Sequence, residues 1–175
     1  MAGKTFQIVA GISLNGKIAD TNGNFEPYSS AEDQRWLKKK IAESDVLIMG
    51  RKTFEKHAKH TKKPIIVFTT AVQGIRIGKD GKRELHWFND KKEELLNLCR
   101  LLKYKKVTIL GGARVYHWFL DQKLASDVYL TIEPFFIGKG KQLLEGDWLK
   151  EQKSWKLRSS RTLNRKGSLL LHYQP

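Results

Sequence analysis

Apolar residues along the chain fall into short runs that predict buried β-strands. Each run is rich in β-branched or other large apolar side chains and is closed by turn-forming residues, a pattern typical of strands that are mostly covered. The runs are Phe6–Ile12, Val46–Met49, Ile65–Thr69, Val107–Leu110 and Val128–Ile132. The sequence therefore predicts a sheet that contains these five strands.

Between the apolar runs lie segments with the period of amphipathic helices, apolar on one side and polar on the other. The segments are Ala31–Ala42, Thr53–His60, Lys91–Leu102 and Ala113–Leu120. Because strands and helices alternate, we expect a parallel sheet with helices on its faces.

The last third of the chain has a different pattern. Trp155–Arg161 and Ser168–Tyr173 are separated by Asn164, Arg165, Lys166 and Gly167, which predicts an antiparallel hairpin at one sheet edge. No repeat, linker or change of composition marks a second domain. We therefore expect one three-layer α/β domain over residues 1–175, with a mixed, mainly parallel sheet and helices on both faces.

Composition adds an unusual positive charge. The 175 residues include 33 Lys and Arg against 18 Asp and Glu, which gives a formal charge of +15, and 40% are apolar, enough for one core. Such a charge favours an anionic partner, namely nucleic acid, a membrane surface or a phosphorylated small molecule. The cations are spread along the chain rather than collected in a tail, so charge alone does not choose among these partners.

The cysteine and histidine content and the start of the chain exclude several classes of protein. The single cysteine, Cys99, excludes an internal disulfide and a cysteine-based metal cluster. The five histidines have no convergent spacing with carboxylates, so no metal is expected. The start of the chain has neither an apolar signal core nor a spanning run, which predicts a soluble, cytoplasmic protein.

Two glycine turns, Gly50–Thr53 and Gly111–Arg114, each connect a predicted strand to a predicted helix. A helix N-terminus offers free backbone N–H groups, glycine allows close approach, and Arg and Lys add charge-assisted donors. Ligands of open α/β sheets bind outside the carboxyl ends of the strands, so the turns are expected to converge on one crevice suited to a dinucleotide. A tight connection also favours glycine without a ligand. The Rossmann G-x-G-x-x-G and Walker patterns are absent.

Asp33 lies four residues before Leu37, on the apolar stripe of the predicted helix 31–42. One interpretation is a capping box with Ser30, in which the acid at the third position bonds the helix start. The other is a partly desolvated carboxylate at a pocket mouth, able to bind an amidine-like edge through two parallel hydrogen bonds. The pattern by itself leaves both open.

These motifs together resemble the dihydrofolate reductase superfamily, which includes the reductase domain of riboflavin biosynthesis. The similarity covers nearly the whole chain in order, and the segments that carry it are Ile8–Ala19, Asp33 with Trp36–Lys38, Met49–Glu55, Phe68–Thr70, Ile109–Tyr116 and Tyr129–Thr131. The most specific is Met49–Glu55, which is similar to the cofactor-phosphate turn of dihydrofolate reductase. The resemblance implies a three-layer dihydrofolate-reductase-like fold and an NADPH-dependent hydride transfer to a C=N bond.

The resemblance also implies roles for individual residues. The catalytic residues would be Asp33, supported by Thr131, and the substrate would contact Val9, Ala10, Leu37, Leu110 and Tyr116. NADPH would be bound by Gly11, Ile18, Gly50, Arg51, Lys52, Thr53, Phe68, Thr69, Thr70, Gly111, Gly112, Ala113, Arg114, Val115 and Tyr116. Arg76 is a further candidate for the 2′-phosphate side of the cofactor.

The segments divide between two branches of the superfamily. Asp33, Met49–Glu55 and Thr131 resemble dihydrofolate reductase and favour reduction of dihydrofolate to tetrahydrofolate, the interpretation preferred at this stage. However, the loop of residues 20–28 lacks the tryptophan that usually follows the mobile loop of that enzyme.

Other segments resemble the riboflavin-type reductases, which would act on a ribosylamino-pyrimidine phosphate. They are Ser13–Lys17, Glu133 with Pro134, and Gly138–Gly140; Lys17, Lys139 and Lys141 are available for the substrate phosphate. The Asp-x-Pro piece that these enzymes usually carry shortly after the cofactor-turn threonine is missing after Thr53.

A different class is a non-catalytic, basic nucleic-acid-binding protein that keeps this fold. The charge of +15 leaves it open. The aromatic residues lie among apolar helical positions, which is typical of a core rather than of a base-stacking platform. We therefore expect a small-molecule substrate, pterin or pyrimidine, no nucleic-acid or membrane partner, and a monomer or homodimer.

Overall fold

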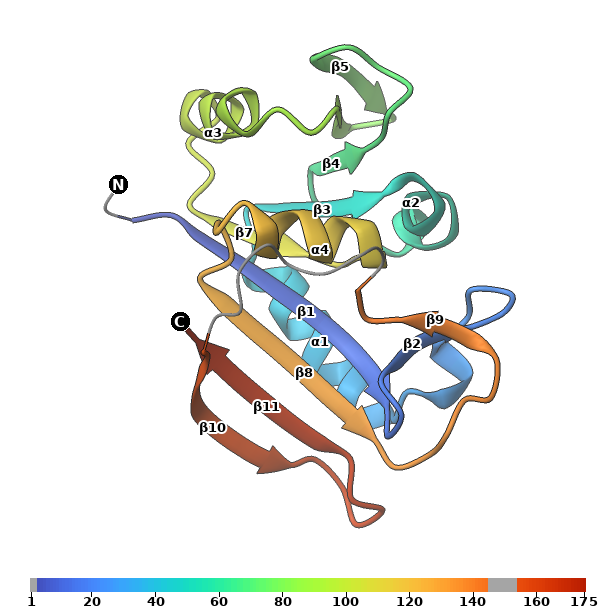
Figure 1. The fold of residues 1–175 in the computed structure, drawn as a ribbon. Coiled ribbons are helices and arrows are strands. Elements are labelled where there is room, and N and C mark those ends of the chain that lie inside the picture. Colours follow the sequence, from blue (N-terminus) through green and yellow to red (C-terminus); the bar gives the residue numbers. More distant parts are fainter. Residues whose placement is uncertain (1–2, 145–153) are drawn as a thin grey trace.

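The computed structural model describes residues 3–144 and 154–175, and its main element is a nine-stranded mixed sheet (Figure 1). The strand order is β10-β11-β8-β1-β7-β3-β4-β6-β5. The strands are β1 (Thr5–Ser13), β3 (Val46–Gly50), β4 (Ile65–Phe68), β5 (Ile75–Asp80), β6 (Arg83–Phe88), β7 (Lys106–Ile109), β8 (Asp127–Glu133), β10 (Lys156–Thr162) and β11 (Leu169–Gln174). The central strands, from β8 through β6, are all parallel to one another, as the alternation of elements predicts.

Helices cover both faces of the sheet, and Figure 1 shows α1 and α4 on opposite faces. The helices are α1 (Ala31–Glu43), α2 (Arg51–His57), α3 (Lys92–Leu101) and α4 (Ala113–Asp121), with 3-10 turns η1 (Glu26–Tyr28) and η2 (Ala58–His60). Apolar residues of α3 and α4 join one core cluster, whereas those of α1 and α2 pack on a second. The three-layer α/β architecture with a mixed, mainly parallel sheet, predicted from the sequence, is confirmed.

Strand β3 shows why the central strands have uninterrupted apolar sequences. Val46 and Ile48 face the cluster under α3 and α4, while Leu47 and Met49 face the opposite cluster. All four side chains are fully buried, because each face of the strand is covered by helices.

The C-terminal hairpin is also confirmed. Strands β10 and β11 pair antiparallel, and β11 pairs antiparallel with β8, which closes that side of the sheet. Asn164 braces the turn, because its side-chain oxygen accepts from the backbone N–H of Lys166 at 3.0 Å and of Ser168 at 3.2 Å.

Four strands were not predicted. β5 and β6 form a hairpin at the far sheet edge, and Gly81 at its turn has φ +62°. β2 (Lys17–Asp20) and β9 (Gly140–Gln142) form a separate two-stranded ribbon beside β1 (Figure 1). β2 and β9 are short, and the residues of β5 are exposed or half-buried, so these strands lack the continuous apolar runs of the central ones.

The helix predicted over Thr53–His60 is wrong at both ends. α2 begins at Arg51, directly after the Gly50 N-cap, and becomes a 3-10 turn at Ala58. The guanidinium of Arg83 accounts for this end, because its Nη1 donates to the carbonyl oxygens of Ala58 and Thr61. The Arg83 side chain therefore supplies the hydrogen bonds that further helical N–H groups would otherwise donate to these carbonyls.

Candidate active site

The two glycine turns meet at the carboxyl edge of the sheet. β3 and β7 are adjacent and parallel, so the turns that follow them lie side by side. The backbone N–H of Gly50 donates to the carbonyl oxygen of Gly111 at 2.7 Å. A β-carbon on Gly112 would lie 3.8 Å from Oγ1 of Thr53. The two turns are therefore in direct contact, as the expected convergence requires.

Gly111 has a backbone conformation that favours glycine. Its φ is +103°, and a β-carbon there would lie 2.9 Å from the hydroxyl oxygen of Tyr116. The Tyr116 hydroxyl donates to the carbonyl oxygen of Val9 at 2.7 Å, and burial raises the pKa of this phenol well above its ordinary value. Tyr116 thus ties the second glycine turn to the middle of β1.

Exposed cations surround the paired turns. Arg51 and Lys52 begin α2, and Arg114 lies at the second position of α4; all three are exposed. Nη1 of Arg51 is paired with Oε1 of Glu55 at 2.8 Å, an exposed pair that contributes little to stability. This end of the crevice is therefore positively charged and open to solvent.

The carboxyl end of β4 provides the next candidate residues. Thr69 is buried and its hydroxyl accepts from the backbone N–H of Ala71 at 3.2 Å, whereas Thr70 is exposed. The ring of Phe68 packs edge-on against Phe88 and Trp118 in the core. Arg76, expected in a loop, lies on β5 instead, with its guanidinium 5.6 Å from the Trp87 ring centre.

Asp33 is the buried residue of α1, with 6% of its surface exposed. The hydroxyl of Ser29 donates to Oδ2 of Asp33 at 2.7 Å, and the Thr131 side chain also hydrogen-bonds this carboxyl group. Burial raises the pKa of Asp33 and the negative charge of Glu133 raises it further, although both hydrogen bonds act in the opposite direction. The predicted desolvated carboxylate is therefore present.

Asp33 lies near β1, which is the neighbour of β7, the strand before the second glycine turn. Thr131 is opposite Gly11 in the register of β8 and β1, and β1 is also paired with β7. Asp33, Gly11 and the paired turns therefore lie at neighbouring positions of one sheet edge.

The proposed apolar walls are only partly brought together. Leu110 packs with the cluster on the α2 face, and Val9 is buried on β1. Ala10 belongs instead to the cluster under α4, because it follows Val9 and adjacent residues of a strand point to opposite faces. Ile18, expected at the cofactor, packs on the same cluster from β2. Leu37 is half-buried on α1.

The loop of residues 20–28 covers part of this edge. A β-carbon on Gly11 would lie 2.4 Å from Cε1 of Phe25, so the aromatic ring rests directly on the glycine. Nζ of Lys56, on α2, donates to the carbonyl oxygens of Asn22 at 2.6 Å and Gly23 at 3.2 Å. The ammonium group therefore holds the loop against the helix that follows the first glycine turn.

Sequence reasoning missed Glu133, Phe25 and Lys56 as site residues. The period of two in β8 places Glu133 on the same face as Thr131, and this signal could have identified it. No local pattern indicates the contact of Phe25 with Gly11 or of Lys56 with its loop, because both join segments far apart in the chain.

Neither a metal site nor a membrane-spanning helix is found among the described residues. Within residues 3–144 and 154–175, no group of three or more His, Cys, Asp or Glu side chains could hold a metal ion. In the same ranges, no helix is both long enough and apolar enough to span a membrane.

Comparison with known proteins identifies the family. Residues 4–167 match the family model described as the RibD C-terminal domain. A bifunctional dihydrofolate reductase-thymidylate synthase from Paramecium tetraurelia is 33% identical over 128 residues, which are 73% of this chain and 26% of that protein. The chain thus spans about a quarter of that relative.

Solved structures agree in fold. A pyrimidine reductase-like protein from Corynebacterium diphtheriae superposes with a TM-score of 0.76 at 14% identity, covering 98% of this chain and 91% of that one. A diaminohydroxyphosphoribosylaminopyrimidine deaminase/5-amino-6-(5-phosphoribosylamino)uracil reductase from Thermotoga maritima gives 0.74 at 16% identity, covering 99% of this chain and 57% of that one.

These matches confirm the superfamily that the sequence motifs resemble. The chain belongs to the RibD C-terminal domain family, within the dihydrofolate-reductase-like superfamily.

Proposed function

We propose that this protein is an NADPH-dependent reductase of the riboflavin type, which transfers hydride to the C=N bond of the ring-opened, imine form of a ribosylamino-pyrimidine phosphate. The observation that carries the proposal is the position of buried Asp33 beside Gly11, next to the edge where the Gly50 and Gly111 turns meet. The family match favours this substrate class over the dihydrofolate preferred from the sequence.

The residues at the paired turns fit a dinucleotide. Gly111 and Gly112 leave the crevice without β-carbons beside Tyr116 and Thr53, and the exposed cations at the start of α2 and α4 supply positive charge. Arg51, Lys52, Thr53 and Arg114 would hold the phosphates of NADPH, with Thr69, Thr70 and Arg76 toward the adenosine side. When bound, NADPH supplies the hydride, and the protein orients the reacting groups.

Asp33 would promote the proton transfer that accompanies reduction. Its raised pKa keeps a larger protonated fraction near neutral pH than an exposed aspartate has, which suits a group that promotes protonation of the accepting nitrogen. The Ser29 and Thr131 hydrogen bonds fix the orientation of the carboxyl group. Val9, Leu37 and Leu110 would form the apolar contacts that hold the substrate ring.

The β2–β9 ribbon offers the second cationic site that a phosphorylated substrate needs. Nζ of Lys17 lies 3.4 Å from the carbonyl oxygen of Gly140, and a β-carbon on Gly23 would lie 3.4 Å from Nζ of Lys141 and 3.2 Å from Nζ of Lys56. Lys139 is exposed just before β9. These lysines support a substrate that carries its own phosphate.

Reduction of dihydrofolate is the second candidate. The Asp33 and Thr131 pair favours it, since a carboxylate can bind the 2-amino and ring N–H groups of a pterin through parallel hydrogen bonds. The 33% identity with the Paramecium enzyme also supports this candidate.

A cofactor-oxidation assay separates the candidates. The protein is incubated with NADPH and either dihydrofolate or the ribosylamino-pyrimidine phosphate, and the loss of reduced-cofactor absorbance is followed. We expect turnover with the phosphorylated pyrimidine, and a loss of at least about a hundredfold in Asp33→Asn with nearly unchanged NADPH affinity. Turnover of dihydrofolate alone would select the second candidate. Salt-sensitive DNA binding without NADPH binding would contradict both.

A further inference from the structure

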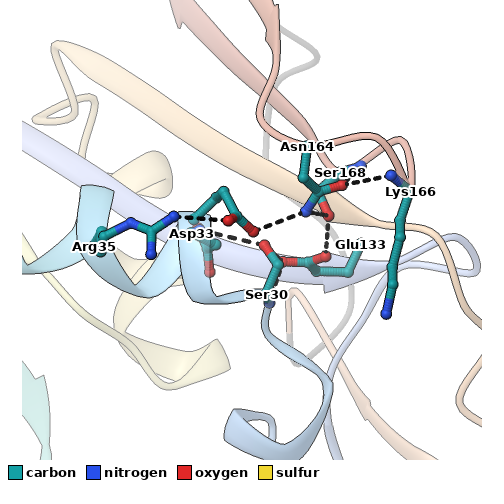
Figure 2. Close-up of polar contacts among 8 residues, drawn as sticks. Ser30, Asp33, Arg35, Glu133, Asn164, Lys166 and Ser168 are labelled. Atoms are coloured by element: carbon teal, nitrogen blue, oxygen red, sulfur yellow. Dashed lines mark hydrogen bonds and ion pairs between the residues drawn. The ribbon is translucent and has the colours of Figure 1, made fainter.

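Glu133 is a buried carboxylate that has no role in the function proposed above. It ends β8, is 2% exposed, and lies on the strand that also carries Thr131. Figure 2 shows its side chain between the start of α1 and the turn of the C-terminal hairpin. A carboxylate taken so far from water must be satisfied by hydrogen bonds.

One carboxylate oxygen is bonded to the helix start. Oε1 of Glu133 accepts from both the backbone N–H and the hydroxyl of Ser30, each at 2.8 Å. Ser30 is the N-cap of α1, and its hydroxyl oxygen in turn accepts from the backbone N–H of Asp33 at 3.2 Å. Glu133 is therefore connected through Ser30 to the backbone of Asp33, the proposed catalytic acid.

The other carboxylate oxygen is bonded to the hairpin. Oε2 accepts from the hydroxyl of Ser168 at 2.5 Å, and the Ser168 oxygen accepts from Nδ2 of Asn164 at 2.9 Å (Figure 2). Asn164 also fixes the turn through its side-chain oxygen. Glu133 thus joins three elements, β8, α1 and the β10–β11 hairpin, at a single buried group.

We infer that Glu133 is a positioning residue for the reductase reaction: its buried carboxylate fixes the Ser30 cap and thereby the position of Asp33 at the site. The inference rests on the proposed function, because it assigns to Glu133 the support of the acid that function requires. Glu133 is 100 positions from Asp33 in the sequence. Through its bond to Ser168, the C-terminal hairpin also supports the position of Asp33.

The charge of Glu133 has a separate consequence for Asp33. Among the groups that shift the pKa of Asp33, Glu133 contributes the negative charge, while Ser29 and Thr131 contribute neutral hydrogen bonds. The charged groups of α1 nearest in sequence, Glu32 and Arg35, pair with each other at 2.7 Å. Removing the charge at Glu133 should therefore lower the pKa of Asp33 and reduce its protonated fraction near neutral pH.

The decisive variant is Glu133→Gln, with Glu32→Gln as its matched control. Glu32 lies next to Asp33 in the first turn of α1 and, like Ser168, accepts a hydrogen bond from Nδ2 of Asn164, at 3.2 Å. It is partly exposed, however, and is not among the groups that shift the pKa of Asp33. The first readout is the 13C carboxyl signal of Asp33, titrated by NMR and identified by its loss in Asp33→Asn. We expect a lower midpoint in Glu133→Gln and an unchanged one in Glu32→Gln.

The second readout is the pH dependence of turnover with NADPH and the phosphorylated pyrimidine. We expect kcat of Glu133→Gln to be severalfold below wild type, because Asp33 is then held less firmly, with the gap widest at high pH, where fewer Asp33 groups are protonated. An unchanged kcat at every pH, or an Asp33 titration that matches wild type, would overturn the inference. Full turnover in Asp33→Asn would instead contradict the proposed function, while the NMR titration would still report on Glu133.

If Glu133→Gln does not fold, Ser168→Ala provides the test. This variant keeps the charge and removes one hydrogen bond from the carboxylate. We expect faster hydrogen exchange of the Ser30 and Asp33 amides, because both depend on the fixed Glu133 carboxylate. Unchanged exchange rates at these two amides would overturn the inference.

Discussion

The backbone N–H of Gly50 donates a hydrogen bond to the carbonyl oxygen of Gly111 at 2.7 Å, which joins the two glycine turns into one unit. Gly50 follows β3 and Gly111 follows β7, so the bond continues the pairing of these strands beyond their ends. A change in either turn should therefore alter both halves of the proposed phosphate crevice.

Gly111→Ala should destabilise the protein and weaken NADPH binding. The new β-carbon would lie 2.9 Å from the Tyr116 hydroxyl, at a φ of +103° that side chains rarely adopt. Strain of this kind costs on the order of 1–3 kcal/mol, measured as a lower free energy of unfolding in urea. Gly138→Ala is the control, since a β-carbon there has no described atom within 4 Å; equal stability of the two variants would contradict the prediction.

Arg51→Ala should raise the dissociation constant of NADPH about tenfold, or about 1.4 kcal/mol, with little change in folding stability. Arg51 loses only an exposed ion pair with Glu55. Arg35→Ala is matched to it, because Arg35 loses a comparable ion pair, with Glu32 on α1, and belongs to neither glycine turn. Cofactor fluorescence titration measures both constants, and an equal change in the two variants would remove the assignment of Arg51 to the cofactor.

Lys56→Met should loosen the loop of residues 20–28. The variant removes the ammonium that donates to Asn22, Gly23 and Asn24 but keeps an apolar stem of similar length. We expect faster hydrogen exchange at the Gly23 amide and a severalfold higher KM for the substrate, because Phe25 is then held less firmly over Gly11. Lys59→Met changes a neighbouring exposed lysine and should leave both quantities unaltered.

His86 should make folding stability sensitive to acid. It is 2% exposed, and neither ring nitrogen has a hydrogen-bond partner among the described residues. Burial lowers the pKa of His86 in the folded state, so below about pH 6.5 the unfolded chain binds the proton first. The free energy of unfolding should then fall as pH decreases through the folded-state pKa.

His86→Leu tests this by urea unfolding at pH 5 and pH 8. We expect the variant to be about 1–2 kcal/mol more stable, because two unsatisfied polar atoms are removed, and to lose less stability on acidification. His60→Gln changes an exposed histidine and should keep the wild-type pH dependence. An unaltered pH dependence in His86→Leu would exclude His86 as the source.

Most of the central sheet could be predicted from local pattern. Strand Val46–Gly50 has four fully buried apolar residues because helices cover both of its faces, and such continuous runs are visible in the sequence. β5 and β9 were missed because their residues are exposed or half-buried, so no apolar run indicates them. Their positions depend on pairing with β6 and β2.

The candidate site shows the same division. The pattern around Asp33 left a helix cap and a buried carboxylate open, and the structure shows that Asp33 is buried. The two glycine turns, expected to converge, are joined by a hydrogen bond. The structure also contains half of the predicted capping box, since Ser30 accepts from the Asp33 amide. The reciprocal bond to the Ser30 N–H comes from Glu133 and not from Asp33.

The sequence by itself determined the helix start and the chemistry of the residues around it, because these follow from spacing within one helix. The tertiary structure alone decided which carboxylate caps that helix. Glu133 reaches Ser30 only through the placement of β8 beside α1, and by taking the cap it leaves the Asp33 side chain to Ser29, Thr131 and the proposed substrate.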